Sequence, residues 1–534
     1  MRFLLALTLA ALVTGAGAGV ALAADRFPAG FQWGVATSGF QTEMGLGANL
    51  DTASDWWAWT HDAAALDALQ VTGDDPGHGP GFWSTYGADA ALARRDLGAS
   101  AFRLSLEWSR IFPRAPAGVR AGSPLTLDTL RRLDARANQS AVRHYRQILV
   151  AIRARHMAPF VTINHFTLPR WIHDPLNVRA RLTGRDPNAP LPLMTRAGWL
   201  DRGTVGAFRA FSAYVAWKFG DLVDQWAPIN EPMVLVTNSY VNAPGITAGN
   251  FPPGVFSFTA AITAVRNLAR ANAASYDAVK RWDTVDAGGD RRAATVGLVQ
   301  NMIDFTPSNP AASQLTAVNH ADYLFNTLLL DAAVKGLYDD NADGAIAPSE
   351  RHPALAGKAD FIGVNYYFRG RTVALEMPLT PLISVLDFLP TTTYRWALNR
   401  SAPQCPTTCS DLGSELSPRG LTGVLTSAAS YGLPLYVTEN GVADADDALR
   451  PKFLRDHLTV LQEAIAGGVD VRGYYAWSLT DNFEWGSGYT PKFGFYRVDR
   501  GTLRRSPRKQ SIATFRLATR MNAVPIPTRA TLPK

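Results

Sequence analysis

The sequence predicts an α/β fold, a single (β/α)8 TIM barrel with long loops at the carboxyl ends of its strands. Eight short runs of strand-forming residues recur along the chain, and the intervals between them are long enough for a helix and a loop. Helical patterns, such as residues 260–282, fill several of these intervals. The chain shows no glycine-rich phosphate motif of the kind that opens a doubly wound sheet, which favours a closed barrel.

The predicted strands are short and apolar, and polar or aromatic side chains punctuate them. They cover residues 31–38, 101–106, 159–164, 225–229, 295–301, 360–365, 435–438 and 472–477. In such barrels the chemistry gathers at the carboxyl ends of the strands. The side chains near these ends are therefore the candidates for a site: Gln41, Arg103, His165, Asn230, Glu231, Asn365, Tyr367, Glu439, Trp477, Glu484 and Trp485.

Three irregular stretches rich in proline, glycine and asparagine follow predicted strands, at residues 115–136, 177–199 and 376–413. We expect them to form loops around the mouth of the barrel. The last one contains the apolar piece PLTPLISVLDFLP. Its prolines and short length predict a folded wall of a binding cleft rather than a membrane element.

The first residues have the pattern of a secretory signal peptide. One arginine is followed by an apolar run too short to span a bilayer comfortably and then by small residues ending in Ala21-Leu22-Ala23. We expect a leader at residues 1–23, cut after Ala23 or Ala24, and one domain over residues 24–534. A membrane anchor is the alternative, but the glycine-rich flank weakens it. The mature protein is expected to be exported, to the periplasm or the medium, without membrane insertion.

The composition favours a packed domain that contacts sugars. Hydrophobic residues make up 47% of the chain, and its 14 tryptophans raise the odds of carbohydrate binding in an exported protein. The net charge of +7 is spread along the chain instead of forming a basic block. We therefore expect no nucleic-acid partner.

The only two cysteines, Cys405 and Cys409, lie close together in CPTTC. In an exported chain this spacing favours a small loop-closing disulfide. Two sulfurs with no histidine beside them make a zinc site improbable.

Two strand ends carry a glutamate in the same way. The run LPLYVTENGV reaches Glu439 just before an Asn-Gly turn signal, and DQWAPINEP places Glu231 between Asn230 and Pro232. Either glutamate alone could be a solvated strand end. Two carboxylates at the ends of two buried strands predict paired-carboxylate chemistry.

Cleavage of a glycosidic bond by two carboxyl groups requires one protonated acid and one ionised carboxylate. Trp226 and Pro228 flank Glu231 and predict an apolar setting that keeps it protonated. Arg103 and the hydroxyl of Tyr367 are the candidates to hold Glu439 ionised. The two environments would thus push the two pKa values apart.

Seven pieces of the chain resemble the signatures of glycoside hydrolase family 1, the β-glucosidase and β-galactosidase family. They run in the family's order over nearly the whole mature chain: FPAGFQWGVATSGFQTE, RLSLEWSRIFP, NHFTLPRWIHDP, WAPINEP, DFIGVNYY, YVTENG and GYYAWSLTDNFEWGSGYTPKFGFYRVD. The pieces SDWWAWTHD and LEWSRIFP are similar to the archaeal-type β-glycosidases in particular. The resemblance implies a retaining β-glycosidase that releases non-reducing terminal sugars by double displacement and needs no cofactor for catalysis.

The same resemblance implies a role for each candidate residue. Glu231 would be the acid/base and Glu439 the nucleophile, with their carboxyl groups about 5 to 5.5 Å apart as in retaining enzymes. Arg103, Asn365 and Tyr367 would position the nucleophile. The sugar would be bound by Gln41, His165, Asn230, Glu484 and Trp485, with Trp477 as its stacking floor.

Each of these roles has a purely structural alternative. Trp477 and Trp485 could be core aromatics, His165 a satisfied buried histidine, and Arg103 a structural ion-pair partner. Two residues depart from the family pattern, because Phe166 and Ser414 stand where tryptophan is common. These departures affect the expected shape of the outer cleft and not the proposed chemistry.

Two other functions use the same features. A transglycosylase differs only in letting an acceptor sugar reach the intermediate, and a non-catalytic sugar-binding protein usually loses one of the carboxylates. The Glu484-Trp485 pair favours a neutral sugar over a phosphorylated one. The sequence does not choose between glucose, galactose and fucose, and it does not give the aglycone or the oligomeric state.

Residues 339–350, DDNADGAIAPSE, fit the twelve-residue calcium loop. The ligands of a structural Ca2+ would be Asp339, Asn341, Asp343, the carbonyl of Ala345, and Glu350. Pro348 and Pro353 disfavour a regular exiting helix, so a solvated acidic segment is the alternative.

Overall fold

Eight parallel strands close into a barrel in the computed structural model, which describes residues 26–117, 122, 124–241, 250–394 and 404–525. The predicted signal peptide, residues 1–23, lies outside these ranges. Each predicted strand run corresponds to one barrel strand, so the predicted fold class is confirmed. The strands are β1 (Gln32–Ala36), β2 (Ala101–Ser105), β3 (Ala158–Asn164), β4 (Gln225–Ile229), β5 (Thr295–Asn301), β7 (Phe361–Tyr366), β10 (Leu435–Asn440) and β11 (Val471–Trp477).

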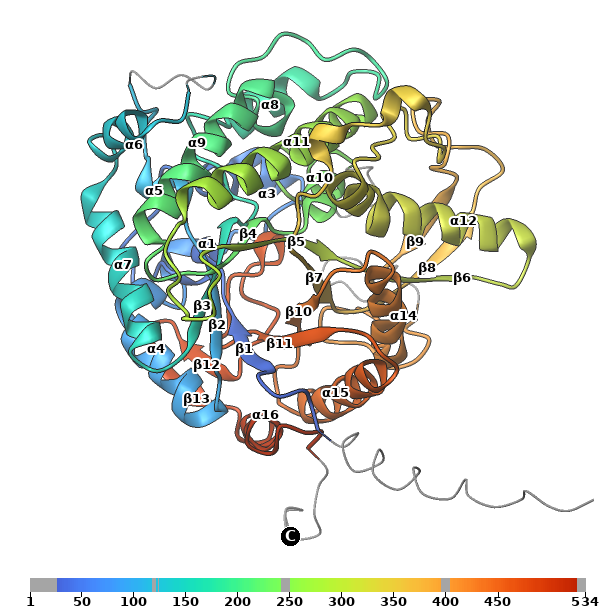
Figure 1. Ribbon diagram of the computed structural model, residues 1–534. Coiled ribbons are helices and arrows are strands. Elements are labelled where there is room, and N and C mark those ends of the chain that lie inside the picture. Colours follow the sequence, from blue (N-terminus) through green and yellow to red (C-terminus); the bar gives the residue numbers. More distant parts are fainter. Residues whose placement is uncertain (1–25, 118–121, 123, 242–249, 395–403, 526–534) are drawn as a thin grey trace, which may run out of the picture.

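The order around the barrel follows the sequence, with β1 pairing both β2 and β11 to close the sheet. Helices surround the strands on the outside (Figure 1). In chain order the helices are α1 (Gly39–Thr42), α2 (Asp55–Thr60), α3 (Ala63–Asp67), α4 (Phe82–Leu97), α5 (Trp108–Ile111), α6 (Leu127–Asp134), α7 (Gln139–Arg153), α8 (Pro175–Leu182), α9 (Arg202–Phe219), α10 (Pro232–Tyr240), α11 (Phe258–Trp282), α12 (Ala312–Asp322), α13 (Leu328–Leu330), α14 (Pro418–Ala429), α15 (Arg450–Ala466) and α16 (Lys509–Met521).

Strand β10 runs further than its sequence suggested. Asn440 was expected to begin a turn, but it pairs with Tyr366 of β7 and Ala476 of β11. Its side chain donates to the carbonyl of Tyr366 at 2.6 Å and accepts from the hydroxyl of Tyr474 at 2.8 Å. These tertiary hydrogen bonds outweigh the local turn preference, so Glu439 lies within the strand rather than just beyond it.

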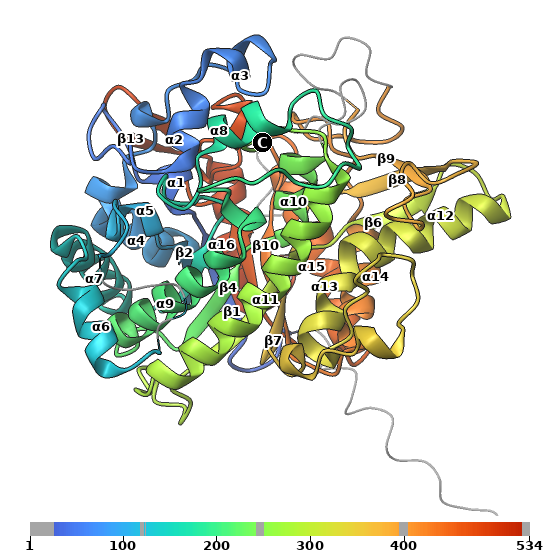
Figure 2. The ribbon, with the colours of Figure 1, turned by 90° about the horizontal axis from the view of Figure 1, so that it is seen from above.

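The three irregular stretches are more structured than expected in their described parts. Helix α6 lies within residues 115–136, and α8 overlaps residues 177–199. Within residues 376–413, β9 (Phe388–Thr391) joins β6 (Asp304–Pro307) and β8 (Arg369–Ala374) in a second sheet. This sheet lies with α12 to one side of the barrel (Figures 1 and 2).

The apolar piece PLTPLISVLDFLP packs against helices. Its residues Ile383 and Val385 cluster with Phe258 at the start of α11, and Phe388 clusters with Ala317 and Ala321 of α12. The piece therefore contributes to two small hydrophobic clusters, one at the start of α11 and one against α12.

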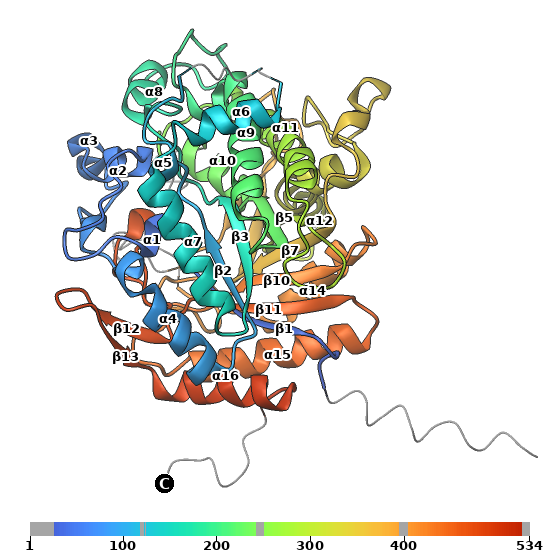
Figure 3. The ribbon, with the colours of Figure 1, turned by 60° about the vertical axis from the view of Figure 1, so that its left-hand side comes forward.

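The two ends of the described chain meet at the base of the barrel. The hairpin of β12 (Tyr496–Asp499) and β13 (Arg504–Pro507) and helix α16 lie beside α4 (Figure 3). The side chain of Asn522 accepts from the indole N–H of Trp33 at 2.9 Å and donates to the carbonyl of Phe27 at 2.7 Å. These contacts fasten the first strand to the last helix.

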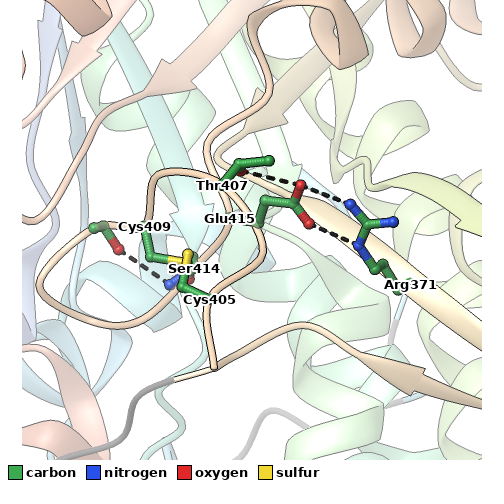
Figure 4. Close-up of a disulfide and its surroundings, with 7 residues drawn as sticks. Arg371, Cys405, Thr407, Cys409, Ser414 and Glu415 are labelled. Carbon is green, nitrogen blue, oxygen red and sulfur yellow. Dashed lines mark hydrogen bonds and ion pairs between the residues drawn. A yellow bond between two sulfur atoms is a disulfide. The ribbon is translucent and has the colours of Figure 1, made fainter. Parts of the chain in front are cut away.

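Cys405 and Cys409 are joined by a disulfide (Figure 4). Cys409 also pairs with Glu415 in a short antiparallel bridge. The carboxylate of Glu415 accepts two hydrogen bonds from Arg371 of β8, both at 3.0 Å, and one from Thr407 at 3.2 Å. The disulfide loop is thus attached to the second sheet.

Within the described ranges, no helix is both long and apolar enough to cross a lipid bilayer.

Aromatic rings fill the interior of the barrel below the site. The ring of Phe160 on β3 meets those of Phe361 on β7 and Tyr475 on β11 edge-on, with centroids 5.7 and 5.6 Å apart. Gly297 on β5 makes room for this layer, because an added β-carbon would lie 2.3 Å from the Phe361 ring. The guanidinium of Arg103 lies 5.5 Å above the ring of Phe160. The packed rings therefore support the charged groups at the mouth.

Adding one carbon at Gly297 should destabilise the barrel, because a filled core tolerates little extra volume. Such overpacking typically costs about 1–3 kcal/mol. We expect Gly297→Ala to lower the free energy of unfolding by about that amount in urea denaturation. Gly87→Ala is the matched control, since a β-carbon at this position in α4 meets nothing within 4 Å beyond the helix itself. It should leave stability unchanged or slightly higher, and equal losses in the two variants would contradict the interpretation.

Candidate active site

The two predicted catalytic glutamates lie at the carboxyl ends of strands β4 and β10. Glu231 lies two residues after the end of β4 and forms the N-cap of α10, with a left-handed backbone at φ 47°. Glu439 is the fifth residue of β10 and pairs with Asn365 of β7. Both side chains are buried, with 7% and 3% of their surface exposed. Two carboxyl groups are thus held at one end of the barrel.

A buried arginine on β2 links the two strand ends. Nη1 of Arg103 donates to Oε1 of Glu439, and Nη2 donates to Oδ1 of Asn230 at 2.7 Å. Nη1 also reaches the carbonyl of Thr438 at 3.2 Å, and Nε donates to the hydroxyl of Thr162 at 3.2 Å. The guanidinium therefore satisfies Glu439 directly and orients the residue next to Glu231.

Asn365 on β7 completes the link on the other side. Its Nδ2 donates to Oε1 of Glu231 at 2.6 Å and to Oδ1 of Asn230 at 3.1 Å. Its Oδ1 accepts from the hydroxyl of Thr438 at 2.6 Å, which fixes which way the amide faces. One amide thus contacts Glu231 while being held by the residue that precedes Glu439.

The environment of Glu231 favours its protonated form. Burial raises the pKa of Glu231, and the nearby Glu439 carboxylate raises it further. The hydrogen bond from Asn365 and the charge of Arg103 act in the opposite direction and are weaker. The flanking Trp226, expected to supply the apolar setting, does not do so, because its indole packs in the outer core and donates to Asp283 at 2.8 Å. The largest cause of the raised pKa is the burial of Glu231 itself.

Glu439 receives hydrogen bonds on both of its oxygens. Arg103 donates to Oε1, and the hydroxyl of Tyr367 donates to Oε2. Burial and the Glu439 carboxylate raise the pKa of Tyr367 well above its usual range, so the phenol keeps its proton and remains a donor. A cation and a phenol thus hold the two oxygens of Glu439 in place by charge-assisted hydrogen bonds.

Gln41 and Glu484 lie together at the edge of the site. Nε2 of Gln41 donates to the carbonyl of Phe483 at 2.9 Å and lies 3.4 Å from Oε2 of Glu484. Ser38 donates to the amide oxygen of Gln41 at 2.6 Å, and Asn482 donates to Glu484 at 2.7 Å. Burial raises the pKa of Glu484 to about 7. The pair offers both donors and acceptors in a fixed geometry.

His165 follows β3, and its ring lies near two tryptophans. Its ring lies 6.1 Å from Trp477 and 6.1 Å from Trp485, nearly parallel to both. Burial and the charge of Arg103 lower the pKa of His165 well below its usual range, so the imidazole is neutral. Nε2 lies 3.4 Å from Nδ2 of Asn230, and among the described residues its Nδ1 has no hydrogen-bond partner.

The structure therefore brings all eleven predicted strand-end residues into one connected site. Sequence reasoning missed three supporting side chains: Thr438, which orients Asn365; Asn482, which holds Glu484; and Glu107, which contacts the segments that carry Gln41 and His165. The sequence signal that could have identified Thr438 and Asn482 is their position, one residue before Glu439 and two residues before Glu484. Glu107 stood within the piece RLSLEWSRIFP as a carboxylate between two apolar residues.

The predicted calcium ligands lie apart from this site, in a loop before β7. Asp339 accepts from the backbone N–H groups of Asp343 and Gly344 at 3.2 and 2.8 Å. Glu350 accepts from those of Asp340 and Ala347 at 3.0 and 2.8 Å. Across the part of the chain that the structure describes, no three acidic, histidine or cysteine side chains are grouped to hold a metal ion. The loop is closed by its own hydrogen bonds.

The chain is similar to known glycosidases over most of its length. Residues 23–519 match the model of glycosyl hydrolase family 1. A β-galactosidase of Pyrococcus woesei is 38% identical over 517 residues, covering 93% of this chain and 98% of that protein.

Solved structures agree with the sequence match. The β-glycosidase of Thermosphaera aggregans has a TM-score of 0.78 at 32% identity and covers 94% of this chain and 98% of its own. A β-glucosidase of Pyrococcus furiosus has a TM-score of 0.77 at 33% identity and covers 94% and 97%. With the family model spanning nearly the whole chain, this protein belongs to glycosyl hydrolase family 1 and is a glycoside hydrolase.

Proposed function

We propose that this hydrolase is a retaining β-glycosidase that removes β-linked sugars from the non-reducing end of oligosaccharides or glycosides. The observation that carries the proposal is the contrast between its two carboxyl groups. Burial and a neighbouring carboxylate raise the pKa of Glu231, whereas Glu439 accepts from a guanidinium and a phenol. One acid and one carboxylate are the two groups that the reaction requires.

In the first step Glu439 attacks the anomeric carbon, and Glu231 gives its proton to the departing glycosidic oxygen. The bond between that carbon and the oxygen breaks as an ester bond to Glu439 forms. Arg103 and Tyr367 position the attacking carboxylate by their hydrogen bonds. The aglycone leaves as an alcohol, and Glu231 is left ionised.

In the second step Glu231 removes a proton from water, and the water oxygen attacks the anomeric carbon from the face that the aglycone left. The ester to Glu439 breaks, and the sugar is released with its original configuration. Asn365 donates to Glu231 in either protonation state and holds it in reach. A sugar acceptor in place of water would give transglycosylation by the same steps.

The sugar-binding role rests on the polar and aromatic groups beside the carboxyl pair. His165 is a buried, neutral ring, and no described residue pairs with its Nδ1; a sugar hydroxyl would pair with it. Gln41, Asn230 and Glu484 offer further donors and acceptors. Trp477 and Trp485 provide flat apolar surfaces for a sugar face. The relatives are a β-galactosidase and a β-glucosidase by name, and a neutral hexose of either kind fits these groups.

We also propose that the protein is exported. The leader pattern at residues 1–23 overlaps the family match, residues 23–519, by one residue only, and Cys405 and Cys409 form a disulfide of the kind that oxidising compartments favour.

The two catalytic roles predict opposite products when azide replaces the missing group. In Glu231→Ala, azide needs no general base and attacks the glycosyl-enzyme from the aglycone side, which gives a β-glycosyl azide. In Glu439→Ala, azide occupies the space of the lost carboxylate and gives the α-glycosyl azide.

NMR of the products distinguishes the two azide anomers. Hydrolysis without azide should fall by about 10²–10⁴-fold in Glu231→Ala and by at least about 10⁴-fold in Glu439→Ala. Wild-type rates in Glu439→Ala, or the same anomer from both variants, would refute the assignment.

The raised pKa of Glu231 predicts the alkaline side of the pH profile. The first step needs the protonated acid, so kcat/KM should fall as pH rises through a pKa well above the ordinary glutamate range. An aryl glycoside with a dinitrophenyl leaving group needs little proton donation, so its profile should be flatter on this side. A fall at the ordinary glutamate pKa would contradict the raised pKa of Glu231.

Calcium binding by residues 339–350 stays a prediction of the sequence. Metal bound to the folded state alone raises the melting temperature by mass action. We expect millimolar calcium to raise the melting temperature of chelator-treated protein, and Asp343→Ala to abolish the rise. An unchanged melting temperature of the wild-type protein at millimolar calcium would refute calcium binding by this loop.

A further inference from the structure

Glu107 is a buried carboxyl group that takes no part in the proposed chemistry. It follows β2, forms the N-cap of α5, and has only 1% of its surface exposed. A carboxyl group of this kind is costly to bury unless its oxygens are satisfied. Its partners therefore indicate what it holds in place.

Each oxygen of Glu107 contacts a different sugar-binding segment. Oε1 accepts from the backbone N–H of Phe40 at 3.1 Å, and Oε2 accepts from the hydroxyl of Thr167 at 2.6 Å. Phe40 directly precedes Gln41 in α1, and Thr167 comes two residues after His165. One side chain thus spans the two segments that carry these residues.

The approach of Glu107 to α1 is close. A β-carbon at Gly39 would lie 2.5 Å from Oε1 and 2.6 Å from Cγ of Glu107, so glycine is what leaves room for the carboxyl group. The N–H of Gly39 donates to the hydroxyl of Ser105 at 2.8 Å. Two successive N–H groups of α1 are thus fixed by residues at the end of β2.

Neighbouring side chains fix Glu107 in turn. Its backbone N–H donates to the hydroxyl of Tyr145 at 3.0 Å, and that hydroxyl donates to Glu43 at 2.9 Å. Burial, aided by the carboxylates of Glu43 and Asp51, raises the pKa of Glu107 to about 8. At neutral pH the group is mostly uncharged, and a glutamine amide has the same shape. Its oxygen can accept from the N–H of Phe40, and its NH2 group can donate to the hydroxyl of Thr167.

We propose that Glu107 is a positioning residue for the sugar site, which sets the distance between Gln41 and His165 and so the affinity for the terminal sugar. The inference rests on the proposed β-glycosidase function, because it assigns the two residues to sugar binding. Glu107 does not contact Glu231 or Glu439 through any described hydrogen bond, so its loss should affect binding more than chemistry.

The test compares steady-state kinetics of Glu107→Ala and Glu107→Gln on an aryl β-glucoside. We expect Glu107→Ala to raise KM about tenfold, which is the effect of losing one hydrogen bond. The kcat should stay within about threefold of the wild-type value. Glu107→Gln should return KM to within about twofold of wild type. Thr167→Val removes the hydrogen bond between Thr167 and Glu107 while leaving Glu107 in place. It should also raise KM, and it tests the proposal if Glu107→Ala does not fold.

Asp89→Ala is the matched control, because Asp89 on α4 is equally buried but contacts Thr85 and Arg505, which lie outside the sugar-binding segments. It should lower the melting temperature as Glu107→Ala does and leave KM near the wild-type value. The Glu107→Ala/Thr167→Val double variant should show the KM of one single variant and not the product of both effects.

Three results would overturn the inference. They are an unchanged KM in folded Glu107→Ala or Thr167→Val, a KM in Glu107→Gln as high as in Glu107→Ala, and a KM in Asp89→Ala that rises as much as in Glu107→Ala. An inactive wild-type enzyme on all aryl β-glycosides would instead refute the proposed function. The wild-type measurement therefore separates the two failures.

Discussion

The site depends on one buried cation, the guanidinium of Arg103. Removing a charge from water is expensive, and the cost is offset only if each nitrogen of the charged group finds a partner. Arg103 meets this condition with Glu439, Asn230, Thr162 and the carbonyl of Thr438, and it lies over the ring of Phe160. These partners come from different strands, so the charge is compensated only when the barrel is closed. Folding and assembly of the site are therefore the same event.

The same cation sets the electrostatics of its neighbours. It compensates Glu439, contributes to keeping His165 neutral, and opposes the rise in the pKa of Glu231 without overcoming it. The two glutamates have the same side chain, so the difference between their environments comes from the groups that contact each of them. Glu439 accepts from a cation and a phenol, whereas Glu231 has an amide and its own burial. A closed barrel can thus create both environments at one end, for two residues that lie far apart in the sequence.

Much of this could be predicted from the sequence because strand runs and strand-end residues are local signals. All eight barrel strands were predicted, and Gln41, Glu231 and Glu439 were found by their place at strand ends. The reasons for their properties were not local. Trp226 next to Glu231 in sequence points to Asp283 instead, and Asn440 continues a strand that its turn preference should have ended. Glu107 was overlooked because its partners, Phe40 and Thr167, lie some sixty residues away on either side. Contacts of this kind exist only once the barrel has closed.

The extension of β10 through Asn440 has a consequence for which atoms move during the reaction. Glu439 pairs with Asn365 of β7, and the next residue, Asn440, pairs with both β7 and β11, so the chain is held in the sheet on either side of the nucleophile. The nucleophile therefore stays in place during the reaction, and the anomeric carbon of the sugar must move toward it. We therefore expect the pucker of the pyranose ring, rather than any protein hinge, to carry most of the displacement along the reaction coordinate.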